Sequence, residues 1–529
     1  MTNRRISYGL ILVYGALFAF ALFLFFYQLN NRLLWGDEAE TALLAKNILR
    51  FGIPKTVDGV NHITVLGNLR DENAAHVWTW APWLPEYFVA GVYRLFGENT
   101  LTSRVGFAAI GWLSVILLGH VSYQIYRDHR IALSTMFLVA TSEIFLLHSR
   151  QCRYYSVTVF AEILLVYGAF ALLSNRRRAI WLLAFGLILQ FYTNFIVAAA
   201  NLPLLIALSW FSRRQRQVLI KLAVAVGLFL LAALPWLIYA RTWQQSRELI
   251  HESLMAKAWY YSTEWHFHFI PWIFLLLPLV GLFRKRQASQ ASSKTTARLL
   301  EQSLSILIIG YFIILLLPPS ELRYLLPLLP VACLLAATWS FRYLRWPVLA
   351  MGLIGLQAAT NLIAIVTVFG LDREHSLRSP LLQFIGGLKQ GYADRFTDVR
   401  DFFVKEAMPG QTVWVRDPEF PLIFYTGLQI IDARLRIPEN LPDWILPQSA
   451  SGLSDQNTLT PPDSIKSHYE AISIRVHDSD RLDNVPEPDC YQYRPTEKTT
   501  DFLIYRKYSR QINFKRASIL CYGWSRSFV

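Results

Sequence analysis

Long apolar segments recur along residues 1–371 of this chain and constrain its fold more than any other feature. There are eleven, at about residues 8–29, 101–125, 131–148, 154–173, 179–194, 195–211, 217–239, 268–283, 302–317, 322–340 and 346–371. About 20 apolar residues span a bilayer as a helix, and shorter segments can be tilted or buried within a bundle. Charged residues make up only 17% of the chain, against about 25% in soluble proteins. The sequence therefore predicts an all-α polytopic membrane protein of about eleven transmembrane helices.

Basic residues cluster in every second connection between these segments. The six clusters are Arg4-Arg5, Arg127–Arg130, Arg176–Arg178, Arg213–Arg216, Arg284–Arg286 and Arg342–Arg345. Cytoplasmic loops carry an excess of Lys and Arg, so the N-terminus is predicted inside and the C-terminus outside. The first segment is too long for a cleaved signal peptide and is expected to be a signal anchor. The net charge of +14 comes from the membrane part, so it indicates topology and membrane lipids, with no nucleic-acid partner.

The character of the chain changes at about residue 372. Apolar runs shorten to strand length, at Thr412–Val415, Leu422–Tyr425, Ala471–Ile474 and Phe502–Tyr505, and Leu381–Leu388 has a helical pattern. Residues 372–529 are therefore predicted to form an extracytoplasmic α/β domain that follows a transmembrane module, 1–371. Outside the cell, one disulfide could form between Cys490 and Cys521.

The first outer loop, 30–100, contains two predicted helices. Asp37 to Arg50 has apolar residues at helical spacing and a polar opposite face, which predicts an amphipathic helix on the outer surface. This helix ends before Gly52 and Pro54, which are stop signals. Pro82 to Phe96 is a second, apolar and aromatic helix that stops at Gly97.

Three carboxylates, Asp37, Glu38 and Glu40, follow the first apolar segment at the predicted membrane surface. One interpretation is helix capping, because anions are favourable at a helix N-terminus. The other is catalytic: one carboxylate takes a proton from an acceptor hydroxyl or amine while the acceptor attacks. Capping accounts for one carboxylate better than for three, and both interpretations stay open.

Arginines on the predicted outer side run against the cytoplasmic bias of basic residues. Arg150 and Arg153 flank one turn, and Arg323-Tyr324 follows Glu321 at another. Arginine binds phosphate through two parallel hydrogen bonds and stays charged when partly buried. These residues are candidates for binding a phosphate-bearing lipid head group. The alternative is pairing with Glu321, with Glu143 or with bulk lipid phosphate.

Other polar and aromatic groups in the outer loops give weaker signals. His266-Phe267-His268 is a poor metal motif, and Asp71-Glu72 with His62 and His76 is more typical of solvated loop charge. The sequence assigns no metal site and leaves open whether the protein uses a divalent metal ion. Aromatic residues of the first outer loop can stack on sugar rings or form a membrane-interface belt, and they include Trp80, Trp83 and Tyr87.

Four stretches together resemble the GT-C superfamily of glycosyltransferases that use polyprenyl-phosphate sugars, above all protein O-mannosyltransferases and lipid A aminoarabinose transferases. They are Asp37–Glu40 with Ala45–Leu49, Trp80–Gly97 followed by Arg104, Arg150–Ser156, and Glu321–Pro330. The aminoarabinose transferases have Glu-Lys-Pro where this chain has Trp80-Ala81-Pro82, so the lysine that meets donor phosphate is absent.

The resemblance implies an inverting enzyme with Asp37 as base and Glu38 as a supporting carboxylate. Donor phosphate would be bound by Arg153, Arg323, Arg150, Arg70 and Tyr324. Candidates for the sugar or acceptor site are Glu40, Trp80, Trp83, Tyr87 and Glu321. The donor would be a polyprenyl-phosphate sugar, and the acceptor a lipid, glycan or protein outside a bacterial inner membrane. The alternatives are an envelope-polysaccharide polymerase or ligase, and a flippase or transporter of lipid-linked sugars.

Overall fold

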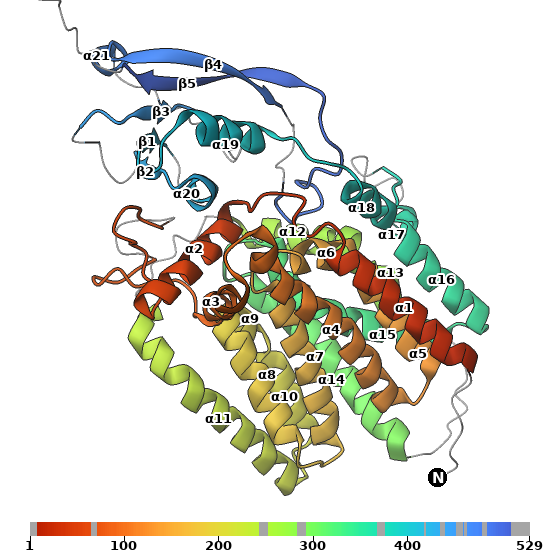
Figure 1. The fold of residues 1–529 in the computed structure, drawn as a ribbon. Coiled ribbons are helices and arrows are strands. Elements are labelled where there is room, and N and C mark those ends of the chain that lie inside the picture. The colour runs from red at the N-terminus through yellow and green to blue at the C-terminus, as the bar shows by residue number, and fades with distance from the viewer. Residues whose placement is uncertain are drawn as a thin grey trace, which may run out of the picture.

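The chain forms a bundle of helices with a small sheet domain at one end (Figure 1). The computed structural model describes residues 8–64, 71–242, 252–282, 292–367, 376–416, 419–433, 438, 440–450, 459, 463–478 and 484–508. Helices dominate this part of the chain, and the strands all belong to the C-terminal domain.

Six helical runs in the described residues are long and apolar enough to cross a membrane. They are α1 (Tyr8–Phe26), α4 (Thr100–Tyr126), α7 (Tyr155–Leu173), α11 (Arg216–Ala240), most of α14 (Ser292–Leu315), and η3 (Leu322–Leu328) continued by α15 (Leu329–Tyr343). A seventh is formed if α5 (His129–Ala140) and α6 (Glu143–Ser149), which meet at 61°, count as one span. This is the architecture of a multi-pass membrane protein.

The remaining apolar segments fold as short helices. They are α8 (Ala179–Thr193), α9 (Phe195–Ala200), α10 (Leu202–Phe211), α13 (Trp272–Leu282), α16 (Pro347–Ala359) and α17 (Leu362–Thr367). Asn194 ends α8 and caps α9, because its side chain accepts hydrogen bonds from the backbone N–H groups of Ile196 and Val197. The predicted segment 195–211 is broken at Asn201, between α9 and α10, and the segment 346–371 is broken at Thr360, after α16. The count of eleven spans stays a prediction.

Four connections are predicted to share the outer side: 30–100, the turn at 149–153, the loop 240–267 and the turn Pro318–Glu321. Their described residues lie at one end of the bundle (Figure 1). There the chain adds α2 (Gly36–Phe51), α3 (Leu84–Phe96), α12 (Leu254–Glu264) and the π-helical turn η2 (Trp265–Phe269). Asn73 donates a hydrogen bond to the Tyr239 hydroxyl, and Lys257 donates to the Pro318 carbonyl. These contacts join the first outer loop to α11, and α12 to the turn that follows α14.

Helix α2 is more deeply enclosed than its pattern predicts. Its residues from Glu38 to Ala45 are all buried, including the polar Glu40 and Thr41. It packs against α3 and against α20 (Phe420–Thr426) of the C-terminal domain. The predicted amphipathic helix is therefore enclosed by protein, because Arg153 of the bundle contacts Glu40 and Thr41 while α20 packs against apolar residues of α2. The predicted stop is confirmed: Gly52 has φ = 79° and ends the helix.

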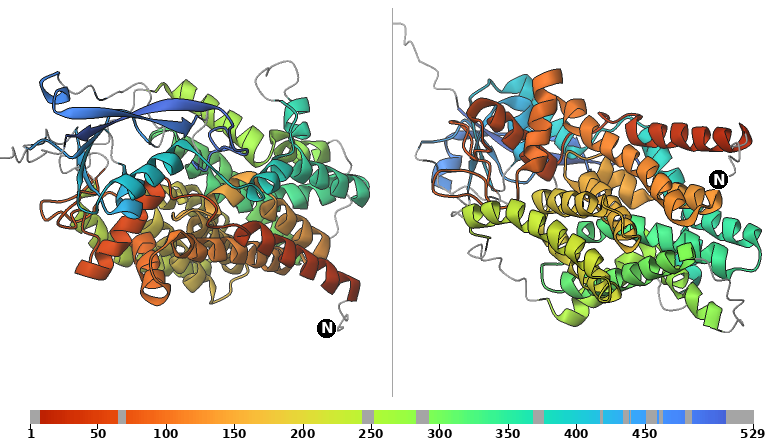
Figure 2. Two further views of the ribbon diagram at one scale, coloured as in Figure 1. Left: turned by 45° about the horizontal axis from the view of Figure 1, so that its top comes forward. Right: turned by 90° about the horizontal axis from the view of Figure 1, so that it is seen from below.

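The C-terminal domain is a five-stranded sheet flanked by helices. Its strands are β1 (Thr412–Val415), β2 (Gln429–Asp432), β3 (Trp444–Leu446), β4 (Tyr469–His477) and β5 (Thr499–Lys507), in the order β2-β1-β3-β5-β4. Strand β1 is parallel to β2 and β3, whereas β5 is antiparallel to β3 and β4. The other helices are α18 (Pro380–Leu388), α19 (Arg395–Glu406) and α21 (Asp463–Lys466). In Figure 2, α19 and the sheet lie over the end of the bundle that carries α2.

One predicted strand of this domain is a helix. Leu422–Tyr425 lies within α20, where Pro421 occupies the first turn and Gly427 ends the helix with φ = 67°. A proline at the start and a glycine at the end are helix signals that outweigh a short apolar run. Leu422 and Ile423 join a core that is shared with Ala42 and Leu43 of α2.

Candidate active site

Asp37 lies in the first turn of α2, where two arginines from distant segments converge on it. Its Oδ2 atom is 2.9 Å from Nη1 of Arg323 in η3 and 3.3 Å from Nη2 of Arg153, in the turn between α6 and α7. The Asp37 side chain keeps 29% of its surface exposed. The site therefore places a possible proton acceptor, the Asp37 carboxylate, next to two guanidinium groups that can bind an anion.

Arg153 is held by α2 at several points. Its Nη1 donates to the Glu40 carboxylate at 3.1 Å, to the Thr41 hydroxyl at 2.9 Å and to the Asp37 carbonyl at 3.2 Å. Burial lowers the pKa of this guanidinium, but the carboxylates of Asp37 and Glu40 raise it well above its ordinary value. Its buried Nε–H has no hydrogen-bond partner among the described residues.

Arg323 contacts the same oxygen of Asp37 as Arg153 does. Its Nη2 donates to Glu321 at 3.1 Å, and the backbone N–H of Glu321 donates to the Tyr261 hydroxyl. Its buried Nε–H, like that of Arg153, finds no acceptor in the part of the chain that is described. Tyr324, the next residue, packs against the core of the bundle. Two arginines beside Asp37 thus each retain an unused donor.

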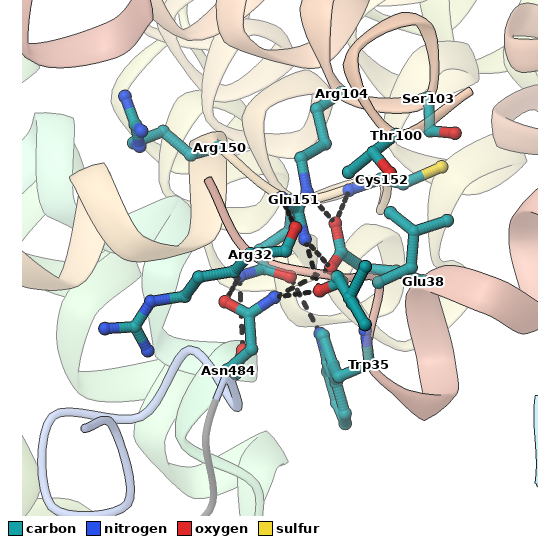
Figure 3. A network of polar contacts seen from close by, with 12 residues as sticks. Arg32, Trp35, Glu38, Thr100, Ser103, Arg104, Arg150, Gln151, Cys152 and Asn484 are labelled. Carbon is teal, nitrogen blue, oxygen red and sulfur yellow. Dashed lines mark hydrogen bonds and ion pairs between the residues drawn. The ribbon is translucent and has the colours of Figure 1, made fainter. Parts of the chain in front are cut away.

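Glu38 makes a different set of contacts and is fully buried (Figure 3). Arg104 of α4 donates Nε to one of its oxygens at 2.7 Å and Nη2 to the other at 2.6 Å. The backbone N–H groups of Cys152 and Trp35 also donate to it, and so does the Asn484 side chain. A carboxylate with five donors positions its surroundings and has little capacity left to accept a substrate proton.

Arg104 extends this network to the chain before α2. Its remaining N–H groups donate to the carbonyls of Leu29, Arg32 and Leu33. The Gln151 side chain accepts from the Trp35 indole at 2.7 Å and donates to Asn484 (Figure 3). The network therefore fixes the start of α2 against the α6–α7 turn, which places Asp37 beside Arg153.

Two further carboxyls lie close to Arg153 in a dry environment. Burial raises the pKa of Glu40 to about 7, although Arg153 acts to lower it. Burial also raises the pKa of Glu86, in α3, to about 8, and the negative charge of Glu40 adds to this. Oε2 of Glu86 has no hydrogen-bond partner among the described residues. At neutral pH, Glu86 is therefore a neutral carboxylic acid near the site.

The raised pKa of Glu86 makes the stability of the protein fall as pH rises. The folded carboxyl binds its proton up to about pH 8, whereas the unfolded one releases it near 4.5. The stabilisation is complete below about pH 4.5 and is lost as pH rises toward 8. We expect Glu86→Gln to flatten this dependence. Between pH 5 and 8.5 in detergent, the unfolding temperature of wild type should drop by several degrees more than that of the variant. Glu98→Gln, at an exposed carboxylate, should preserve the wild-type slope, and equal slopes for all three proteins would refute the effect.

Several predicted site residues lie apart from Asp37. Arg150 donates to the carbonyls of Leu24, Phe25, Tyr27 and Gln28, and so caps the C-terminus of α1. Tyr87 donates to the Gly52 carbonyl, at the far end of α2 and about 20 Å from Asp37 by helix rise. Arg70 and Cys521 lie outside the described residues.

The tryptophans of the first outer loop are tied to its backbone and to α11. The Trp83 indole donates to the Trp78 carbonyl at 2.7 Å, and its ring meets Tyr239 edge-on at 5.5 Å. Trp80 donates its backbone N–H to the Asp71 carbonyl. Trp83 occupies the N-cap position of α3, the helix that carries Glu86.

Two groups of side chains could hold a metal ion in the described part of the chain: His62, Glu72 and His76, and Glu264, His268 and Asp489. In the second group His268 is 3.6 Å from Glu264 and 3.5 Å from Asp489. His266 does not join it, because its ring contacts the Ala364 carbonyl at 2.9 Å. The His266-Phe267-His268 motif therefore supplies one ligand at most.

The segment 484–493 contacts the end of the bundle in a way that no sequence signal indicated. Asn484 reaches Glu38, and Gln492 accepts a hydrogen bond from the Arg32 guanidinium. Burial raises the pKa of Glu487, and the nearby Glu321 carboxylate adds to the shift. These polar residues follow the last predicted membrane segment by more than a hundred positions, so only tertiary structure brings them to the site.

Comparison with known proteins finds a likeness in structure alone. No protein-family model matches the chain, and no curated protein matches it by sequence. ArnT from Cupriavidus metallidurans bound to undecaprenyl phosphate superposes with a TM-score of 0.55 at 15% identity, over 88% of this chain and 93% of that chain. The apo form of ArnT gives 0.55 at 16% identity, over 87% and 92%.

An oligosaccharyltransferase from Archaeoglobus fulgidus gives a TM-score of 0.48 at 12% identity, over 81% of this chain and 65% of that chain. The likeness to ArnT extends over nearly the whole of both chains. It shows that this chain shares the fold of ArnT.

Proposed function

We propose that this protein is a membrane glycosyltransferase that moves a sugar from a polyprenyl-phosphate donor to a lipid, glycan or protein acceptor on the extracytoplasmic side. The observation that carries this proposal is the pair of arginines on Asp37. Arg153 and Arg323 bring positive charge and two unused N–H donors to one accessible carboxylate. The ArnT-like fold supports it, since that structure holds undecaprenyl phosphate.

In the proposed reaction Asp37 acts as the general base. It takes the proton from the acceptor O–H or N–H as the acceptor atom forms a bond to the anomeric carbon. The bond between that carbon and the phosphate oxygen breaks, and its electron pair leaves with the polyprenyl phosphate. Attack opposite the leaving group inverts the anomeric centre.

The arginines stabilise the departing phosphate. Donor phosphate replaces the Asp37 carboxylate at the guanidinium groups of Arg153 and Arg323, and this frees Asp37 to accept the proton. Hydrogen bonds between guanidinium and phosphate are charge-assisted, and in a water-poor site they stabilise the charge that develops on the leaving group. Glu40 orients Arg153, Glu321 orients Arg323, and Glu38 positions the start of α2 through Arg104.

The remaining roles follow from position. Tyr324 lies next to Arg323 and is assigned to the donor side. Trp80 and Trp83 of the first outer loop are assigned to the sugar or acceptor. Tyr87 is left out because it binds the far end of α2, and Arg150 because it binds the end of α1. In this proposal the N-terminus lies in the cytoplasm of a bacterium, and the chain crosses the inner membrane eleven times. The module 1–371 carries the reaction, and the domain 372–529 lies outside the cytoplasm and handles the acceptor.

Loss of either arginine should weaken donor binding. We expect Arg153→Ala and Arg323→Ala each to raise the Kd for undecaprenyl phosphate about 10- to 150-fold, since a hydrogen bond to a charged group contributes about 1.5–3 kcal/mol. Binding can be measured by competition with a labelled lipid phosphate in detergent. Arg345→Ala, at an exposed arginine beside Trp346, is the matched control. Unchanged affinity in both variants would remove the phosphate role.

A flippase or transporter of lipid-linked sugars is the second candidate. Its supporting observation is Glu162, a buried carboxylate within α7 that accepts hydrogen bonds from Gln190 at 2.7 Å and Asn201 at 3.1 Å. Ionisable residues inside a membrane often mark transport pathways. A polymerase or ligase of envelope polysaccharide would share the Asp37 chemistry. Transfer of sugar by purified protein separates the enzymes from the transporter, and the acceptor that is labelled separates the two enzymes.

A further inference from the structure

The first outer loop brings His62, Glu72 and His76 together away from Asp37. Isolated bridges pair Lys55 with Val77, Val57 with His62, and Glu72 with Trp78. They fold the loop back on itself, so that residues ten and fourteen positions after His62 reach it. Residues 55–57 thus link the segment that carries His62 with the segment that carries Glu72 and His76.

The geometry of the three side chains is that of a ligand set. Nε2 of His62 is 2.9 Å from Oε1 of Glu72, and Nδ1 of His76 is 3.2 Å from Oε2. The nitrogen and oxygen atoms that could bind an ion all lie within 4.8 Å of one another. The Glu72 side chain is 3% exposed, whereas His62 and His76 are 35% and 51% exposed. The group is thus anchored at its carboxylate and open to solvent at its imidazoles.

We propose that His62, Glu72 and His76 bind a divalent cation of the zinc class. Zinc is held by imidazole nitrogen and carboxylate oxygen at about 2.0–2.2 Å, so tetrahedral ligands stand about 3.3 Å apart. The two nitrogen–oxygen distances are already near this value, and small side-chain movements complete the set. The exposed face leaves the fourth position to water.

The surroundings of Glu72 fit a metal ligand. The Thr56 hydroxyl donates to Glu72 and contacts the His76 carbonyl, so it orients two of the three residues. His76 itself holds φ at 54°, a conformation that non-glycine residues seldom adopt.

This cation would join two parts of the outer loop with different neighbours. Beside His62, Asn61 donates to the Leu428 carbonyl and accepts from the Ile430 N–H, which attaches the loop to β2. Beside Glu72, the negative charge of Asp71 acts on Glu40, a partner of Arg153. A metal clamp here holds the loop between the C-terminal domain and the Asp37 cluster without touching Asp37.

Metal content of the full-length protein tests this proposal directly. Protein purified in detergent is stripped with chelator, dialysed against micromolar Zn²⁺ and analysed by inductively coupled plasma mass spectrometry. Titration with Co²⁺ reports the ligand set, because tetrahedral cobalt absorbs strongly in the visible range. Wild type should bind one equivalent and give the tetrahedral cobalt spectrum. Its unfolding temperature should rise with Zn²⁺.

The variants locate the ion. An outer partner alone contributes about 10- to 100-fold to metal affinity, so His76→Ala and Glu72→Gln should weaken binding at least about 100-fold. His62→Gln keeps a polar side chain at this position, so weaker metal binding in this variant would not be due to misfolding. His468→Ala, at an exposed histidine of the C-terminal domain, should bind like wild type.

Absence of bound metal in wild type would overturn the proposal and leave two imidazoles that hydrogen-bond a carboxylate. Loss of metal in His268→Ala but not in His76→Ala would assign the ion to the other group instead. Both outcomes are read without a transfer assay, so they are independent of the proposed glycosyltransferase activity.

Discussion

Asp37→Asn is expected to reduce sugar transfer about 100- to 10,000-fold, the usual contribution of general acid–base catalysis. Asparagine has nearly the same shape and can still accept hydrogen bonds from Arg153 and Arg323, but it cannot take up the acceptor proton. The ion pairs that it loses are partly exposed, so folding should be little affected. Turnover of label from donor to acceptor measures the effect, and the unfolding temperature checks the fold.

Asp401→Asn is the matched control for this substitution. Asp401 is an exposed aspartate of α19 that pairs with its neighbour Arg400. It should retain full activity. Wild-type turnover in Asp37→Asn would show that the base is another residue.

Glu38→Gln is expected to produce the largest loss of stability. The substitution leaves the Arg104 guanidinium buried without its counter-charge, and breaking one side of a buried ion pair typically costs about 3–5 kcal/mol. Glu98→Gln, which breaks an exposed pair with Lys46, should cost less than about 1 kcal/mol. Unfolding of the purified variants in detergent, followed by tryptophan fluorescence, gives the comparison.

A double variant shows whether the loss comes from the stranded charge. Glu38→Gln combined with Arg104→Met removes both charges, so it should recover a clear part of the stability that the single variant loses. If Glu38→Gln is as stable as Glu98→Gln, the Glu38–Arg104 pair does not hold the start of α2. Activity should fall with stability in Glu38→Gln, since Asp37 would then lose its position.

The local elements were predictable where the chain carries its own signals. Strand β1 matches the predicted Thr412–Val415, and α2 begins and ends where the carboxylates and Gly52 indicated. The apolar segments mark the helices of the bundle, but length and composition support six or seven spans. The breaks at Asn201 and Thr360 come from local turn geometry that hydropathy does not record.

What depends on tertiary contacts was less predictable. The outer arginines were candidates because they opposed the charge bias, and the structure does bring Arg153 and Arg323 to Asp37. The same reasoning did not distinguish Arg150 from these two arginines. Arg150 instead donates hydrogen bonds to the backbone carbonyls at the end of α1. The partner Asn484 could not be predicted, because it lies 446 residues from Glu38 and has no motif.

Sugar transfer by the purified wild-type protein, in detergent with lipid, is the decisive test of the proposed glycosyltransferase activity. A panel of radiolabelled polyprenyl-phosphate sugars is offered one at a time, with membrane extract as acceptor. We expect label to pass from one of these donors to a lipid, glycan or protein, with release of an equal amount of free polyprenyl phosphate. Bound donor with no transfer from any member of the panel would contradict this proposal and favour the flippase or transporter.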